Sequence, residues 1–228
     1  MGEYDGKPAD VVPVRVWDRP LRLFHWALVL CLAGSWITGE QGMLEWHERF
    51  GLTAIALVVF RVIWGFVGGE FARFSSFVRG PGAVVSYLRE TLAGRHPEHA
   101  GHNPLGALAV LALLLLVGTQ ATLGLFANDD ILYEGPLYHL VGSSLSGTLT
   151  GLHHQLFDIL LIVVILHVVA VIAYMVFLRD DLILPMFTGM KRLAPKDVPA
   201  RVRRTPWWVA LAILIVCGAA AYGLTLLG

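Results

Sequence analysis

Long apolar runs separated by short polar segments dominate this chain, and five of the runs are long enough to cross a membrane. A transmembrane α-helix needs about 17–25 predominantly apolar residues. The pattern therefore predicts an all-α integral membrane protein, with a four-helix bundle and one extra C-terminal transmembrane helix. The predicted spans cover residues 23–39, 50–67, 104–126, 152–177 and 206–227.

Composition agrees with a membrane protein. Hydrophobic residues make up 56% of the 228 residues, charged residues make up 15%, and the mean hydropathy is +0.66. Soluble domains average about 45–50% apolar residues. The two cysteines, Cys31 and Cys217, both lie in apolar runs. This excludes a covalently attached c-type haem, a cysteine zinc site and an iron–sulfur cluster. We expect membrane lipid to surround the chain and no nucleic acid to bind it.

Basic residues alternate between the polar segments. Lys and Arg are frequent before the first span and after the second and fourth, whereas residues 127–151 contain none and carry Asp129, Asp130 and Glu134. Basic loops face the cytoplasm in most membrane proteins. The alternation predicts five spans with a cytoplasmic N-terminus and an outer C-terminus.

Two histidines of the fourth span, His153 and His167, are separated by almost a whole number of helical turns. About four turns bring both imidazoles to nearly the same face, about 21 Å apart along the axis. His47 lies at the outer start of the second span and His25 at the cytoplasmic start of the first. Each membrane level thus has two histidines from different helices, which is the requirement for a b-type haem with two axial imidazoles. The predicted pairs are His25 with His167 for an inner haem and His47 with His153 for an outer haem.

Two arginines are candidate partners of the haem propionates. Arg61 follows His47 at the same spacing that separates His153 from His167, so it lies on the same helix face as His47 and one level deeper. Arg22 lies about one turn before His25. A buried guanidinium pairs well with a carboxylate. The alternatives are that Arg61 extends to the cytoplasmic surface and that Arg22 is a basic anchor.

Other histidines fit the pattern less well. His154 points about 140° away from His167 around the helix, and His139 lies in the third loop. The tract RHPEHAGHNP resembles a metal-binding sequence but has Glu98 as its only acid, so we expect a solvated loop. Its histidines are His96, His99 and His102.

These motifs resemble the bacterial cytochrome b561 family, which includes the cytochrome b subunits of nickel–iron hydrogenases. The matching pieces, within residues 11–190, are RLFHW around His25, the His47-to-Arg61 spacing, RVIWGFVG, GHNP and the His153-to-His167 span. The resemblance implies a multi-pass protein of the bacterial inner membrane with two b-type haems, held by these same four histidines, and with quinone as a partner. It divides the chain into a cytoplasmic segment (1–22), a di-haem domain (23–190), and a basic linker with a fifth helix (191–228).

Three functions fit this core. In each of them the chain is either an electron-transfer protein or the cytochrome b subunit of an oxidoreductase. The first is a relay between the quinone pool and a periplasmic redox protein such as a c-type cytochrome. The second is the membrane anchor of a hydrogenase-like enzyme, and the third is a superoxide:quinone oxidoreductase. The acidic outer face would repel superoxide and attract a basic partner, which favours the relay. A metal transporter is the alternative of another class, but Asp158 is the only carboxylate well inside a span.

Overall fold

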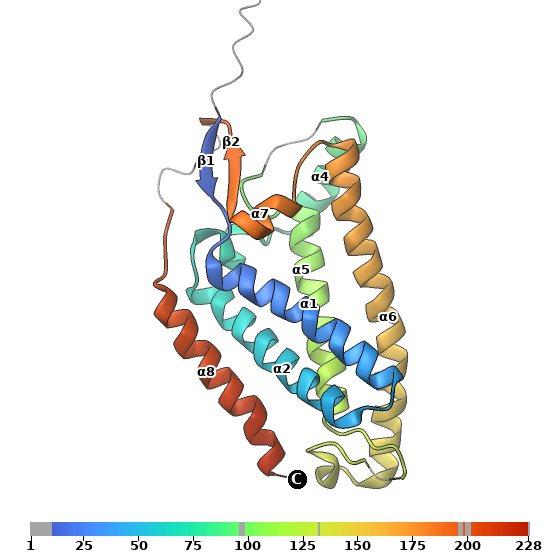
Figure 1. The fold of residues 1–228 in the computed structure, drawn as a ribbon. Coiled ribbons are helices and arrows are strands. Elements are labelled where there is room, and N and C mark those ends of the chain that lie inside the picture. The colour runs from blue at the N-terminus through green and yellow to red at the C-terminus, as the bar shows by residue number, and fades with distance from the viewer. Residues whose placement is uncertain (1–10, 96–98, 132, 196–197, 199–201, 228) are drawn as a thin grey trace, which may run out of the picture.

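The computed structural model describes residues 11–95, 99–131, 133–195, 198 and 202–227. Within these residues, five helices are long and apolar enough to cross a membrane (Figure 1), which confirms the predicted all-α membrane bundle. They are α1 (Arg19–Glu40), α2 (Leu44–Val67), α5 (Pro104–Gly124), α6 (Gly142–Phe177) and α8 (Trp207–Gly223), the last continued by the 3-10 turn η4 (Leu224–Leu226).

The first, second and fourth of these helices begin earlier than hydropathy alone predicts. Helix α1 begins at Arg19 because the Asp18 side chain caps it, accepting a 2.8 Å hydrogen bond from the Leu21 amide. Helix α6 begins at Gly142, and its first turns are rich in serine, threonine and glycine, which carry no hydropathy signal. Its 36 residues extend over about 54 Å, well beyond a hydrocarbon core of roughly 30 Å.

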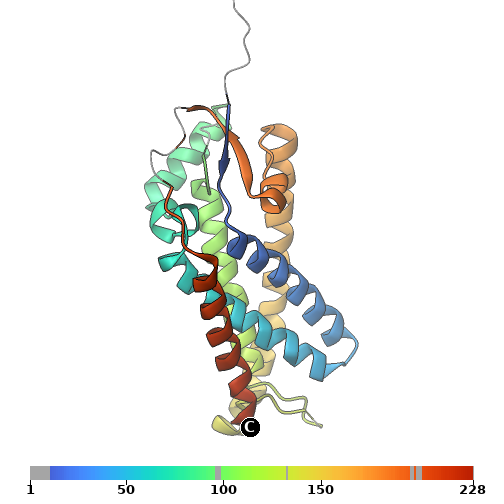
Figure 2. The same ribbon diagram turned by 60° about the vertical axis from the view of Figure 1, so that its left-hand side comes forward.

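Helix α2 is the centre of the bundle. It packs against α1, α5 and α8, whereas α6 packs mainly along α5 (Figures 1 and 2). Half of the most apolar window of α2 is buried, compared with 6% for α6. Trp64 is fully buried and stacks on Phe60 at a ring-centroid distance of 5.9 Å. The backbone of α6 therefore approaches α5 more closely than it approaches the α1–α2 pair.

The fifth helix, α8, lies along α2 on the side away from α6. Two hydrogen bonds tie its flanks to α2. The Thr205 hydroxyl donates to the Val67 carbonyl at 2.8 Å, and the Tyr222 hydroxyl lies 2.9 Å from that of Thr53. Helix α8 is thus packed against the bundle rather than separate from it.

A two-stranded antiparallel sheet joins the beginning of the chain to the segment after α6. Strand β1 (Val12–Arg15) pairs with β2 (Met190–Leu193). The Gly189 carbonyl accepts from the amides of Val16 and Trp17, at 2.9 and 3.2 Å. Gly189 has a φ of +83°, and a Cβ there would lie 2.7 Å from the Trp17 carbonyl oxygen, so this turn requires glycine. We call this end of the bundle the sheet end, and the end formed by residues 125–141 the loop end.

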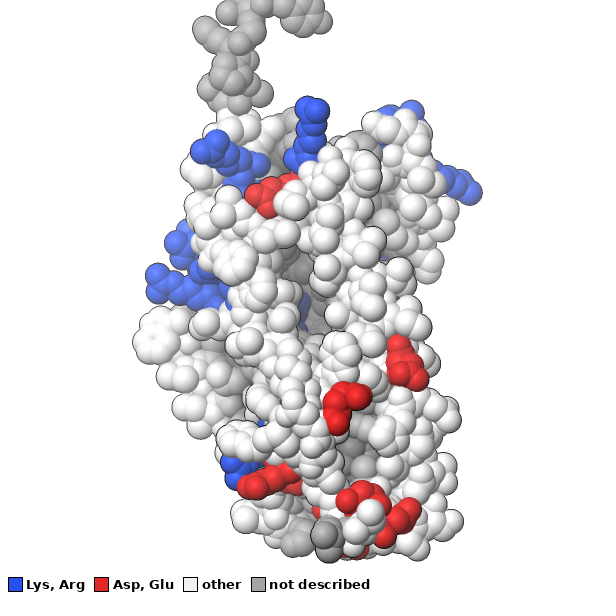
Figure 3. Space-filling model, turned by 45° about the vertical axis from the view of Figure 1, so that its right-hand side comes forward, with Lys and Arg blue, Asp and Glu red and all other residues white. Residues whose placement is uncertain are grey.

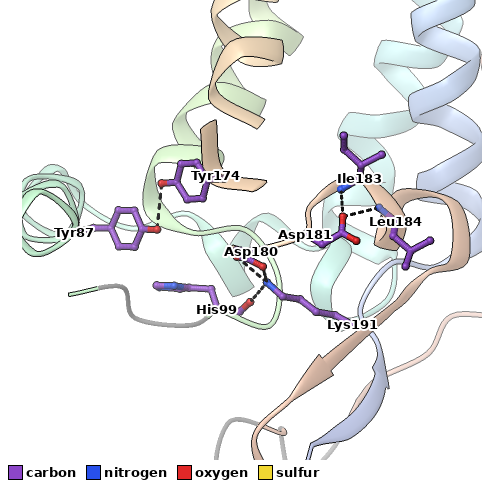
Figure 4. Close-up of polar contacts among 8 residues, drawn as sticks. All are labelled: Tyr87, His99, Tyr174, Asp180, Asp181, Ile183, Leu184 and Lys191. Carbon is purple, nitrogen blue, oxygen red and sulfur yellow. Dashed lines mark hydrogen bonds and ion pairs between the residues drawn. The ribbon is translucent and has the colours of Figure 1, made fainter. Parts of the chain in front are cut away.

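Short helices and a polar cluster complete the sheet end. Figure 4 shows the Lys191 ammonium between an Asp180 carboxylate oxygen, at 2.8 Å, and the His99 carbonyl, at 3.3 Å. The Tyr87 and Tyr174 hydroxyls lie 3.2 Å apart and link α4 to α6. Burial, together with the Tyr174 hydroxyl, raises the pKa of Tyr87. The short elements here are η1 (Glu70–Ala72), α3 (Phe74–Phe77), α4 (Pro81–Leu92) and α7 (Ile183–Thr188).

The two ends carry opposite charge. Figure 3 shows most Lys and Arg side chains toward the sheet end and most Asp and Glu toward the loop end. At the loop end the positive charge of Arg49 is already paired with Glu45. The Tyr133 hydroxyl donates to the Glu48 carboxylate at 3.1 Å, and burial together with that carboxylate raises the pKa of Tyr133. The structure thus carries the charge alternation predicted from the loops.

Candidate functional site

His47 and His153 meet near the loop end of the bundle. They come from the first turns of α2 and from α6, and their ring centroids are 5.9 Å apart with the planes at 80°. The predicted outer pair is therefore brought together in space. A metal–imidazole bond is about 2 Å long, so two ligating nitrogens on opposite sides of one metal are about 4 Å apart. The spacing of the two rings is compatible with that arrangement.

Hydrogen bonds fix the tautomer of both rings. Nδ1 of His47 lies 2.8 Å from the Ser35 carbonyl of α1, and Nδ1 of His153 lies 2.9 Å from the Gln120 carbonyl of α5. A carbonyl oxygen only accepts, so each Nδ1 carries the proton and donates. Each Nε2 is then unprotonated and carries a lone pair, which is the form in which histidine binds a metal. The same backbone contacts orient both rings.

Two glycines make room for these rings. A Cβ at Gly39 of α1 would lie 3.0 Å from His47 Nδ1, and a Cβ at Gly124 of α5 would lie 3.2 Å from His153 Cε1. The amide nitrogen of Gln120 lies 3.3 Å from His153 Nε2, and its Oε1 is buried without a partner among the described residues. Iron at His153 would take the lone pair that this amide contacts, so the Gln120 side chain would have to turn. The residues of this level fit a bis-histidine haem.

His25 and His167 lie nearer the sheet end, on α1 and α6. Both are half-buried, and His25 Nδ1 is buried without a hydrogen-bond partner in the described part of the chain. The His25 ring contacts Trp26 edge-on at 5.0 Å, and His167 lies close enough to interact with it electrostatically. The predicted inner pair therefore shares one region, although no direct ring contact joins it as one joins the outer pair.

Arg61 is buried at the same level. Its side chain is 2% exposed, and neither terminal nitrogen has a hydrogen-bond partner among the described residues. Its guanidinium lies over the Phe74 ring at 4.9 Å. Asp18 interacts with it electrostatically, but the oxygens of Asp18 accept from Leu21 and Trp64. Arg61 does not extend to the surface, so the alternative of a surface-reaching side chain is wrong.

Arg22 lies at the rim of the bundle rather than in its interior. One terminal nitrogen donates to the Phe187 carbonyl of α7, while its Nε is buried without a partner among the residues that the structure describes. A groove of about 300 Å³ opens beside it, lined by four apolar residues and two arginines. Its lining residues are Arg19, Arg22, Leu23, Trp26, Met186 and Phe187.

The expectation of a solvated loop is wrong for His102. Its ring packs on Trp17 at 4.6 Å and on Phe77 at 4.5 Å, and its Nδ1 is buried without a partner in the described residues. Burial lowers the pKa of His102 to about 3, and the charge of Arg61 acts in the same direction. The polar neighbours of His102 in the chain gave no sign of this burial, although the residue lies in the GHNP motif that carries part of the family resemblance.

The remaining histidines belong to neither pair, although the His154 ring lies beside that of His153 with centroids 6.1 Å apart. His154 is exposed, and His139 is exposed in a groove at the loop end. The ring of His99 contacts that of Tyr87 at 5.3 Å. His96 lies outside the described residues. The prediction that His153 rather than His154 faces the bundle agrees with this placement.

Comparison with known proteins adds an independent observation. The model of a family described as prokaryotic cytochrome b561 matches residues 16–189, which contain all four paired histidines and end before α8. Two curated proteins are 26% identical over 137 residues, covering 48% of this chain and 58% of theirs. Both are described as a probable Ni/Fe-hydrogenase 1 B-type cytochrome subunit, from Escherichia coli strains K12 and O157:H7. The match thus spans little more than half of these relatives. No solved structure matches the chain.

Proposed function

The chain belongs to the prokaryotic cytochrome b561 family and is therefore a membrane b-type cytochrome that transfers electrons; we propose that it relays them through two haems between the quinone pool and a redox protein on the other side of the membrane. The observation that carries this proposal is the placement of two histidine pairs at opposite ends of one bundle. His153 and His167 lie on the continuous helix α6, and the helical rise between them separates the two levels by about 21 Å.

The proposed iron ligands are His47 and His153 at the loop end, and His25 and His167 at the sheet end. Haem b supplies a one-electron ferric–ferrous couple when it is bound. The Nδ1 protons of the loop-end pair are held by backbone carbonyls, so both Nε2 atoms are available for iron. Two histidines on each iron would leave no coordination position open, which would suit electron transfer rather than oxygen chemistry.

Arg61 is the proposed partner of a haem propionate at the sheet end. A guanidinium that is almost completely buried without an acceptor is costly unless an anion binds it. Both terminal nitrogens of Arg61 meet this description within the described residues. Arg22 is a second candidate through its Nε, although one of its terminal nitrogens already holds α7.

The basic sheet end is the proposed cytoplasmic side, as the positive-inside rule requires. At this end, the apolar groove beside Leu23 is a suitable place for the head group of a quinone to approach from lipid. Phe187 in the groove stacks on Trp26 at 4.5 Å, and Trp26 contacts His25 at 5.0 Å. The Phe187 and Trp26 rings therefore connect the groove to His25, a proposed haem ligand, through direct ring contacts.

The decisive experiment measures haem and its reduction in the purified protein. We expect two haems b per chain and a sharp reduced-minus-oxidised band with either dithionite or a short-chain ubiquinol. Leu23→Trp, which fills the groove, should slow reduction by the quinol several-fold and leave reduction by dithionite unchanged. A protein without haem would disprove the relay and favour a metal transporter. Unchanged quinol kinetics in Leu23→Trp would disprove the groove alone.

The acidic loop end is the proposed docking face for a basic redox partner, of which a c-type cytochrome is one example. A hydrogenase-like subunit is the second candidate, because the two curated relatives carry that description. Superoxide as a substrate is disfavoured by the negative charge of the same face. The carboxylates of this face are Glu40, Glu45, Glu48, Asp129, Asp130 and Glu134.

Electrostatic docking predicts a strong dependence on salt. The Debye length falls from about 30 Å at roughly 0.01 M salt to about 8 Å at roughly 0.15 M. The rate of electron transfer from the reduced protein to a basic c-type cytochrome should therefore fall several-fold over this range. Stopped-flow mixing measures it, and a neutral one-electron acceptor is the control that should not respond. A rate independent of salt would contradict docking at the acidic face.

A further inference from the structure

His102 lies between α4 and α5, just before α5 begins. Its ring is held by the Trp17 ring, which precedes α1, and by the Phe77 ring of α3. Its Nδ1 atom is buried and has no hydrogen-bond partner among the described residues. A buried polar atom without a hydrogen-bond partner destabilises the fold. Two aromatic rings fix the position of His102, and its Nδ1 lacks a partner. We therefore expect this nitrogen to bind a ligand in addition to the packing role of the ring.

The same aromatic layer holds Arg61. Phe77 contacts Phe74 at 5.8 Å, and the Arg61 guanidinium lies over Phe74 at 4.9 Å. Gly65 of α2 permits this arrangement, because a Cβ there would lie 2.1 Å from a Phe74 ring atom. His102 and Arg61 thus reach one region from different parts of the chain, His102 from the segment before α5 and Arg61 from α2.

The charged groups around His102 favour an anionic ligand. Arg61, His167 and His25 are the groups whose charges act on His102, and all are basic. Three buried nitrogens here, Nη1 and Nη2 of Arg61 and Nδ1 of His102, have no hydrogen-bond partner among the described residues. Burial keeps His102 neutral, so it can donate one N–H without adding charge. A carboxylate would satisfy the three nitrogens together.

We propose that His102 is a positioning residue that donates to a propionate of the sheet-end haem, beside Arg61. The inference rests on the proposed function, since it requires a haem between His25 and His167. The residue anchors the carboxylate and partly neutralises its charge. Because negative charge near the iron favours the ferric form, loss of this donor should lower the reduction potential of that haem.

Two substitutions separate donation from packing. His102→Asn places an amide N–H near the position of Nδ1 and removes the ring. His102→Phe keeps a ring between Trp17 and Phe77 and removes the donor. His99→Asn is the matched control, because it changes a histidine of the same segment that lies against Tyr87. Spectroscopic redox titration of the purified protein measures both haem potentials, and haem content shows whether each variant retains both haems.

We expect His102→Phe to change the reduction equilibrium of one haem at least threefold, which lowers its potential by about 28 mV at about 59 mV per factor of ten. His102→Asn should stay near wild type, and the other haem should not shift. Combining His102→Phe with Arg61→Met should give less than the sum of the single shifts, since both contact one carboxylate.

The proposal would be overturned if His102→Asn shifted the potential of the sheet-end haem and His102→Phe did not. That result would assign a packing role to His102. Equal shifts in both variants, or no shift in either, would overturn it as well. If His102→Phe fails to accumulate, His102→Leu makes the same test. A wild-type protein with no sheet-end haem would instead remove the proposed function, so the two failures are distinguishable.

Discussion

Replacing His153 with alanine is expected to remove about half of the haem b from the purified protein. His153 is the proposed loop-end ligand from α6, and its Nδ1 is already held by the Gln120 carbonyl. Without it, the iron at this level would retain one imidazole, that of His47. The sheet-end haem should remain, because His167 lies about four helical turns away on α6. Pyridine haemochrome analysis gives the haem content, and redox titration shows which potential disappears.

The matched control is His154→Ala, at the next position along the same helix. His154 is exposed, so this variant should retain both haems and both potentials. Retention of both haems in His153→Ala would remove His153 from the ligand set. Loss of a haem in His154→Ala would show that the register of α6 has been assigned wrongly.

Replacing Arg61 with methionine is expected to lower the potential of the sheet-end haem. A unit charge about 10 Å from the iron contributes about 1.7 kcal/mol at an effective dielectric constant of about 20, or about 70 mV for one electron. The loop-end haem, one level away at about 21 Å, should shift by about half as much or less. Redox titration measures both potentials in one experiment.

The same substitution, Arg61→Met, should make the haem-free protein more stable, although it lowers the potential of the sheet-end haem. Arg61 is 2% exposed and has no acceptor for its terminal nitrogens among the described residues, so replacing it with methionine removes a buried charge that has no hydrogen-bonded partner. The haem-free variant should therefore unfold at a higher temperature than haem-free wild type. The control is Arg89→Met, which removes an exposed charge on α4. It should alter neither the haem potentials nor the unfolding temperature of the haem-free protein. Equal effects of Arg61→Met on both haems would argue against a propionate contact.

Helical periodicity alone predicts much of the candidate site. The alignment of His153 and His167 on one face depends only on the helical turn of about 3.6 residues, so it needs no tertiary information. Pairing by depth also follows from the sequence, because each span must cross the same bilayer. The structure places His47 against His153, and it places His25 in the region of His167.

Features that depend on contacts between distant segments could not be predicted in this way. The pairing of β1 with β2 joins two short stretches from nearly opposite ends of the chain, and such short stretches have no strong local pattern. The polar neighbours of His102 predict a solvated position, yet Trp17 and Phe77 from other segments pack against its ring. Helix α6 begins at Gly142, earlier than hydropathy predicts, because small and hydroxyl residues lower hydropathy without preventing a helix.

Helix α6 supplies one imidazole to each proposed haem, and it is the last of the four bundle helices to be synthesised. Neither iron can therefore gain its second axial ligand while only α1, α2 and α5 have left the ribosome. Maturation should then be ordered in time, with cofactor capture following insertion of the fourth helix. A chain that stops before His153 would keep two helices bearing histidines, yet could not complete coordination at either side of the membrane.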